Sequence, residues 1–166
     1  MNSLTTNQIV STRGSGENMT PAAFRSDARH AQHLSRDEQF VQMLDDYRSS
    51  GGLSRSGDVS GLLEGAGRQT VGTVGRWMAN KVVIHFEWQC LTWLPRFQFD
   101  MVGRMPRAAV ALVVVELGDS LDNWGMALWF AKPSSILKGR NPADALPADP
   151  ALVIEAARRD RHLSGA

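Results

Sequence analysis

The most constraining feature of this sequence is the regular placement of helix-starting residues in its last third. Asn141-Pro142 and Asp149-Pro150 each place a side chain that can cap a helix directly before a proline. Proline suits the first helical position because the N–H that it lacks has no partner inside the helix. These two pairs predict a short helix after Asn141 and a longer last helix after Asp149.

Two further helices are predicted upstream of these. Asp122 can cap a helix that must stop before Pro133, because the proline ring crowds the preceding residue. Residues 108–117 are apolar nearly all round, as expected for a central buried helix, and Pro106 suits its first turn. The β-branched run Val113-Val114-Val115 leaves a buried strand as the competing interpretation, but the length of the segment and the absence of flanking turn residues favour a helix.

An amphipathic helix is predicted to begin at Ser35, which forms a capping box with Glu38 three residues later. Phe40, Leu44 and Tyr47 follow at helical spacing and predict one apolar face. A glycine pair then ends the helix.

Residues 53–64 predict a loop and a short helix, and a third helix is expected over residues 68–80. The pattern then changes to alternation over residues 82–94, which predicts a β-hairpin of two short strands. Trp88-Gln89 is expected at its turn, and Pro95 closes the second strand because proline cannot donate to a ladder.

These elements predict a mainly α protein with a small β-hairpin. Residues 1–34 have a polar composition without periodicity and are expected to be a disordered leader. Residues 35–102 are interpreted as a winged helix-turn-helix-like module, and residues 103–166 as a four-helix domain. Phe97 and Phe99 are spaced to point the same way and to seal the hairpin against that domain.

Charge and cysteine content limit the functional classes. The 18 basic and 17 acidic residues nearly cancel, so no field of the whole chain attracts nucleic acid or an anionic membrane. The single cysteine excludes an internal disulfide, which is typical of a reducing cytosol. No signal-peptide pattern opens the sequence, and its longest apolar run is too short to span a bilayer. We therefore expect a soluble, cytoplasmic protein.

The helix expected over residues 68–80 carries a polar stripe that could enter a major groove, with the hairpin as its wing. Two observations weigh against DNA binding and favour an ordinary solvated face. Residues 36–100 hold seven basic and eight acidic side chains, whereas DNA affinity depends on neutralised phosphates. The glycines at positions 72 and 75 also weaken the helix by roughly 1 kcal/mol each. The candidate DNA-binding residues are Arg68, Gln69, Thr73, Arg76 and Asn80.

The sequence offers little support for an enzyme. His85 and Cys90 could come close across the hairpin, but a nucleophile also needs an orienting group and a cleft. The histidines and the cysteine have no metal-site spacing. Residues 65–70 lack the lysine and the preceding strand of a phosphate-binding loop. We expect neither a metal nor a cofactor.

Residues 124–146 read as a small residue, an aromatic pair, a proline and then L-x-G-x-x-P-x-x-x-L. This pattern resembles the toxin-binding domain of the Xre/MbcA/ParS-type antitoxins, whose Leu-x-Gly loop corresponds to Leu137–Gly139 and whose proline corresponds to Pro142. Residues 93–99 resemble the P-x-F-Q-F link of family members with an upstream DNA-binding module. The resemblance covers about residues 90–163.

The resemblance implies an antitoxin-like protein, often dimeric, whose C-terminal domain binds and blocks a toxin. That toxin is commonly of the RES type, which consumes or transfers from NAD. Family members also repress their own operon through the upstream module, although here that half is shorter, glycine-rich and not basic. We therefore expect a homodimer with a RES-type protein partner and operator DNA as a second partner. The expected partner-binding residues are Lys138, Arg140, Arg158, Arg159 and Arg161.

Two other interpretations remain open from the sequence. A stand-alone DNA-binding regulator would use residues 53–94. A structural oligomerisation module would need neither a toxin nor DNA.

Overall fold

The computed structural model describes residues 34–64 and 72–164. The leader predicted over residues 1–34 lies outside this part of the chain except for Leu34. The chain divides into two units, 1–35 and 36–166, and the fold described below is that of the second. The predicted boundary at Gly103 falls within this unit.

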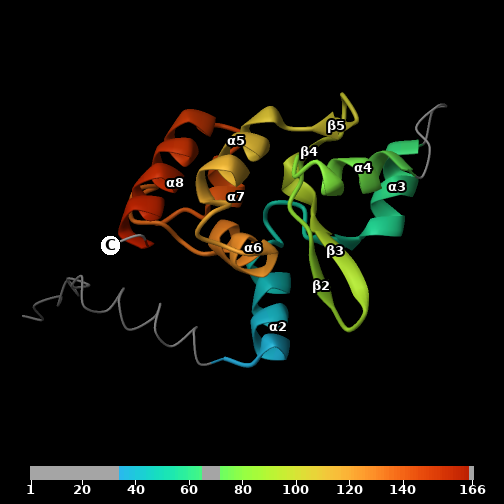
Figure 1. The fold of residues 1–166 in the computed structure, drawn as a ribbon, viewed down its shortest axis with the longest axis horizontal. Helices are drawn as coiled ribbons and strands as arrows, with labels where there is room; N and C mark the ends of the chain where they lie inside the picture. The colour runs from blue at the N-terminus through green and yellow to red at the C-terminus, as the bar shows by residue number, and fades with distance from the viewer. Residues whose placement is uncertain (1–33, 65–71, 165–166) are drawn as a thin grey trace, which may run out of the picture. The chain divides into compact units, whose positions relative to one another are not determined.

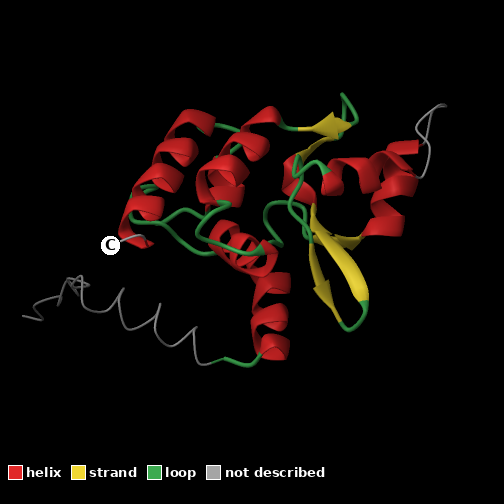
Figure 2. Cartoon of the chain, viewed as in Figure 1, coloured by secondary structure: helices red, strands yellow, loops and turns green. Residues whose placement is uncertain are grey.

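The described residues form a mixed α/β fold with seven α-helices and two small antiparallel sheets (Figures 1 and 2). The first half contains α2 (Arg36–Asp46), β1 (Leu53–Arg55), α3 (Ser56–Glu64), α4 (Gly72–Ala79), β2 (Phe86–Trp88) and β3 (Leu91–Pro95). The second half contains the 3-10 helix η1 (Arg96–Gln98), β4 (Phe99–Asp100), β5 (Met105–Pro106), α5 (Ala108–Leu117), α6 (Asn123–Ala131), α7 (Pro142–Ala145) and α8 (Pro150–Ser164).

The hairpin is the core of a three-stranded sheet in the order β1-β3-β2. β1 occupies residues that were predicted as loop, and it pairs antiparallel with β3 so that Ser54 lies opposite Leu94. The turn was predicted one residue too early, because it is formed by Gln89 and Cys90, at φ of 49° and 60°. Positive φ at both central residues gives a two-residue turn the twist of its strands.

The buried face of α2 is rotated from the predicted one. Phe40, Met43 and Tyr47 are buried, whereas Leu44 is 40% exposed, so the prediction for Leu44 is wrong. The Tyr47 hydroxyl donates a hydrogen bond of 2.6 Å to the Ala127 carbonyl of α6. This contact between residues 80 positions apart joins the end of the first helical segment to α6.

The prediction of a helix over residues 108–117 is confirmed, but two details of it are wrong. Pro106 lies in β5 opposite Phe99 and not in the first turn of the helix. The helix is also not buried all round, since Leu112 and Val115 are 54% and 75% exposed. One face of α5 packs on α8 and the opposite face lies at the surface.

The three later helices begin where the caps and prolines predict. The Asp122 carboxylate accepts a 2.7 Å hydrogen bond from the Gly125 N–H and so caps α6. Pro142 and Pro150 are the first residues of α7 and α8. Asn141 occupies the N-cap position of α7, but its side chain makes no capping hydrogen bond. Its amide instead donates to the Asp46 carbonyl at 3.5 Å.

The buried residues form two clusters. The larger joins α2 and β2 to α5, α6, α7 and α8, and the smaller joins α3 and α4 to β3. Phe97 belongs to the larger cluster and Phe99 to the smaller, so the prediction that they point the same way is wrong. The 3-10 turn at residues 96–98 breaks the alternation of side chains between them.

Gln98 lies between Phe97 of the larger cluster and Phe99 of the smaller one. It is fully buried, and its side-chain amide accepts from the Ile84 N–H at 2.6 Å and donates to the Ile84 carbonyl at 2.9 Å. A single side chain therefore satisfies both backbone groups of a buried residue outside any sheet. Among the described helices, none is long and apolar enough to cross a bilayer.

Candidate functional site

The predicted DNA-reading stripe is described only in part. Arg68 and Gln69 lie outside the described residues. Arg76 in α4 and Asn80 directly after it are four residues apart, and both are exposed. Thr73 in α4 is half-buried. Three of the five candidate residues therefore lie on or next to α4, two of them at the surface.

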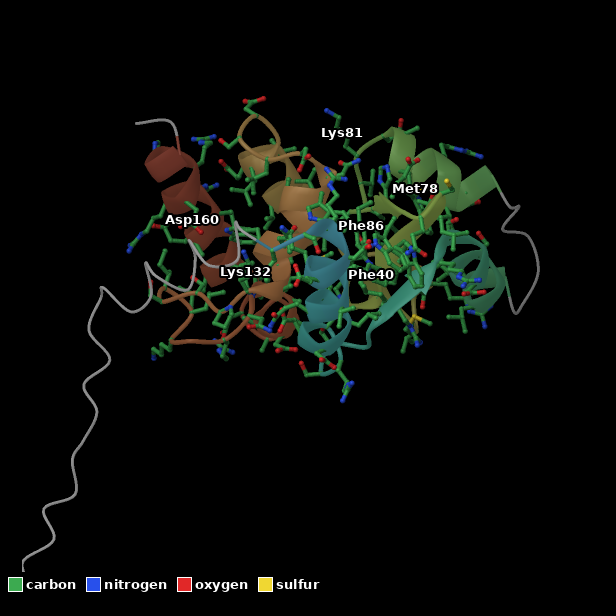
Figure 3. The ribbon with its side chains drawn as sticks, turned by 90° about the horizontal axis from the view of Figure 1, so that it is seen from below. Phe40, Met78, Lys81, Phe86, Lys132 and Asp160 are labelled. Carbon is green, nitrogen blue, oxygen red and sulfur yellow. The ribbon has the colours of Figure 1, made fainter. Side chains whose placement is uncertain are left out.

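The hairpin beside this stripe is held against α2. The Trp88 ring stacks on Phe40 at a centroid distance of 3.8 Å, and its indole N–H donates to Asp37 at 2.8 Å. Phe86 meets Phe40 edge-on at 6.3 Å, and Figure 3 shows these two side chains close together. The hairpin is thus attached to the larger cluster, and Glu87 gives its exposed surface a negative charge.

The Leu-x-Gly segment forms a compact turn after α6. Leu137 is completely buried, and the Gly139 N–H donates to the Ser134 carbonyl at 2.9 Å. The Ser134 N–H donates to the Arg140 carbonyl at 3.1 Å and closes the turn from the other side. Lys138 is exposed at a φ of 58°, a backbone conformation that residues other than glycine rarely adopt. The buried leucine and the hydrogen bonds fix this lysine at the surface.

Arg140 lies at the end of this turn and is partly neutralised. Its guanidinium is 2.8 Å from the Asp149 carboxylate, and both side chains are nearly half exposed. An exposed pair of this kind contributes little to stability, typically about 0–1 kcal/mol. Lys138 takes part in no ion pair with the described residues.

The basic end of α8 is also less cationic than the sequence suggests. Arg158 and Arg161 reach the two oxygens of Glu116 in α5 at 2.9 and 3.0 Å. Arg159 pairs with Glu155 one turn earlier at 3.0 Å. The hydrogen bond from Arg158 and the surrounding positive charges lower the pKa of Glu116 below its usual range. Three predicted partner-binding arginines thus form an ion-pair network with α5 and α8, while their side chains stay 42–62% exposed.

His85 and Cys90 are not brought together. His85 precedes β2 and Cys90 follows it, so they lie at opposite ends of the strand. Cys90 is exposed in the hairpin turn. His85 lines a cavity of about 310 Å³ with Lys81 and Asn123, and its Nε2 lies 3.3 Å from the Asn123 amide nitrogen. The His85 Nδ1 is buried without a hydrogen-bond partner among the described atoms.

This cavity has no arrangement typical of a catalytic centre. Its walls are mostly apolar, and the Asp122 carboxylate at its rim already caps α6. Among the described residues no group of three metal-ligating side chains occurs.

The tryptophans join elements of the larger cluster. The Trp124 indole N–H donates to Gln39 at 2.7 Å, and that of Trp129 donates to Asp160 at 2.7 Å. These bonds attach α6 to α2 on one side and to α8 on the other. Trp124 is buried in the larger cluster, and Trp129 packs against it.

Sequence reasoning missed an exposed apolar surface before and along α5. Five of the nine large apolar side chains exposed in the described residues lie between positions 101 and 115. The sequence signal was present as an uninterrupted apolar run, but such a run does not reveal whether the helix is covered on every side. The five residues are Met101, Val102, Met105, Leu112 and Val115.

The comparisons with known proteins add no family. A scan against protein-family models finds no matching family, and searches of curated proteins and of solved structures find no match.

Proposed function

We propose that this chain is an antitoxin-like protein that binds a partner protein, a RES-type toxin, through its C-terminal helices. The observation that carries this proposal is the turn at residues 134–140, which presents Lys138 on a fixed backbone. A surface that is already ordered before binding loses less conformational entropy when a partner docks.

The surroundings of this turn hold its backbone in place. A non-glycine residue at positive φ costs of the order of 1 kcal/mol, and such residues persist where the surrounding structure holds them. Here buried Leu137 and the hydrogen bond from Gly139 to Ser134 hold Lys138 in place. Lys81, Gln89, Cys90 and Arg104 also have positive φ, so the support for the proposal is the fixed position of Lys138 and not its φ alone.

The arginines of α8 support the same proposal in a weaker way. Arg158 and Arg161 are paired with Glu116, yet more than two fifths of each side chain remains accessible. They can therefore contact an acidic surface without leaving Glu116. Electrostatic complementarity of this kind mainly affects the association rate and the choice of partner.

The experiment is co-expression with a RES-type toxin, followed by titration of the purified proteins. Lys138→Glu should weaken binding at least tenfold, which corresponds to about 1.4 kcal/mol. Lys81→Glu is the matched control, because Lys81 is also an exposed lysine at positive φ but lies at the end of α4 (Figure 3). Absence of a complex, or equal effects of the two substitutions, would contradict the proposal.

A second candidate is a stand-alone DNA-binding regulator. The observation that favours it is the element order α2-β1-α3-α4-β2-β3 with a sheet ordered β1-β3-β2, which is compatible with a winged helix-turn-helix. In that arrangement α4 would be the recognition helix and the β2–β3 turn the wing. A gel shift on the promoter of its own gene should then depend on salt and weaken with Arg76→Ala. Unchanged affinity in that variant would exclude this use of α4.

A further inference from the structure

Another cavity lies where the turn after α2 meets η1 and α7. It has a volume of about 320 Å³ and is lined by residues of all three segments. Two of its side chains are the guanidinium groups of Arg96 and Arg107, and both residues are half-buried. Phe97, Phe99 and Met101 add apolar wall. The cavity therefore combines a few charged groups with apolar surface, as sites for small organic molecules do.

Both arginines are attached to the same short turn. Arg96 is the first residue of η1, and its backbone N–H donates to the Gly52 carbonyl at 2.9 Å. Arg107 lies directly before α5, and its backbone N–H donates to the Gln98 carbonyl at 2.8 Å. Its side chain also donates to η1, from Nε to the Phe97 carbonyl at 3.0 Å. This bond uses only Nε, so the terminal nitrogens of Arg107 are available to another acceptor.

The positive charge of this cavity is not balanced within the part of the chain that the structure describes. Neither arginine forms an ion pair with residues 34–64 or 72–164, and the guanidinium of Arg96 makes no hydrogen bond with them. Asp144 is the only acidic residue of the described lining, and its carboxylate accepts the Ser49 hydroxyl at 2.8 and 3.0 Å. Two guanidinium groups and one carboxylate leave the lining with one net positive charge. Because half-buried charges lose part of their hydration, they favour an oppositely charged partner.

We propose that this cavity binds a small organic molecule with one carboxylate group and an apolar body. A carboxylate matches the planar fork of a guanidinium and accepts two parallel N–H groups from it. A single negative charge neutralises the lining, whereas a dianion would also be repelled by Asp144. The volume leaves room for an apolar group beside Phe97, Phe99 and Met101. This proposal goes beyond toxin binding, because it uses neither the 134–140 turn nor the arginines of α8.

The test is a titration of the full chain with phenylacetate, followed through the NMR chemical shifts of its backbone amides. Saturable shifts are expected around the cavity, at Gly51, Arg96 and Asp144. Phenylacetamide has the same shape without the charge and should bind at least tenfold more weakly. Phenyl phosphate carries a second negative charge and should also bind more weakly. The proposal is overturned if phenylacetate causes no saturable shifts, or if either of the other two molecules binds as tightly as phenylacetate.

Substitutions then test which groups hold the carboxylate. Arg96→Gln should weaken phenylacetate binding at least tenfold, and it should leave the fold intact because this guanidinium bonds to no described residue. Arg55→Gln is the matched control, because it removes an exposed arginine that does not line the cavity. Asp144→Asn keeps an oxygen that can accept the Ser49 hydroxyl, and it should tighten binding by removing a negative charge. Equal losses in the two arginine variants, or an Asp144→Asn protein that binds no more tightly than wild type, would contradict the proposed site.

Discussion

The two hydrophobic clusters differ in size, and the difference shows which elements belong together. The larger cluster contains 21 buried residues from α2, β2 and the C-terminal helices, and the smaller contains six from α3, α4 and neighbouring segments. α2 was predicted as the first helix of an N-terminal module, yet its buried side chains belong to the cluster of α5–α8. We infer that α2 helps to support the C-terminal surfaces.

The comparison predicts the largest loss of stability for Phe40, the α2 residue in the larger cluster that also contacts the hairpin. Phe40→Ala should lower the free energy of unfolding by about 3–5 kcal/mol, because it removes a buried ring packed on Phe86 and Trp88. Urea denaturation measures this value. Val41→Ala is the control on the same helix; Val41 is 59% exposed, and its truncation should cost less than about 0.5 kcal/mol.

A truncation in the smaller cluster should have a smaller and more local effect. Leu63→Ala is expected to cost about 2 kcal/mol, at the low end for a buried leucine, because few side chains surround it. Amide hydrogen exchange should become faster in α3 and α4 and stay unchanged in α6. Exposed Leu62→Ala serves as the control, and an equal acceleration in α6 would show that the two clusters are not distinct.

The segment between the two clusters can be tested at Gln98. Gln98→Met keeps a similar volume but leaves the N–H and the carbonyl of Ile84 without their partner. The expected loss is about 1–2 kcal/mol for buried groups left unpaired. Hydrogen exchange of the Ile84 amide should also become faster. If this amide stays protected in the variant, another group must accept its hydrogen bond in place of Gln98.

The smallest effect is expected at the exposed network on α5 and α8. Because the pKa of Glu116 is lowered in the folded chain, its stabilising contribution is present above the ordinary glutamate pKa and disappears as the pH falls. Glu116→Gln should therefore lower the Tm slightly at pH 7, and the difference from wild type should shrink once the pH falls below about 4.3, the ordinary glutamate value. A difference that is independent of pH would exclude this pairing as its cause.

Much of the helical structure could be predicted because its signals are local. Asp122, Pro142 and Pro150 place helix starts through capping chemistry and a fixed φ, and neither depends on distant residues. The rotation of α2 could not be predicted in the same way, because Met43 and Leu44 both fit helical spacing and only packing in the larger cluster distinguishes them. β1 is three residues long and arises from its pairing with β3, so no pattern of its own announces it.

The candidate surfaces were predictable to a lesser degree. Lys138 was found through the L-x-G pattern, and the structure places it at the surface. The pairing of Glu116 with Arg158 spans 42 residues, so the sequence overstated the positive charge of α8. The exposed face of α5 was missed because the sequence shows only that the helix is apolar. A fully covered apolar helix and a partly exposed one can have the same composition.

The most direct test of this account is native-state hydrogen exchange of the full chain at residue resolution, because the account depends on α2 sharing a core with the C-terminal helices. We expect the amides of Met43 in α2 and Phe130 in α6 to open with the same free energy, and that of Val74 in α4 to open with a lower one. If Met43 instead exchanges together with Val74 while Phe130 remains protected, α2 belongs to the N-terminal module and the account is wrong.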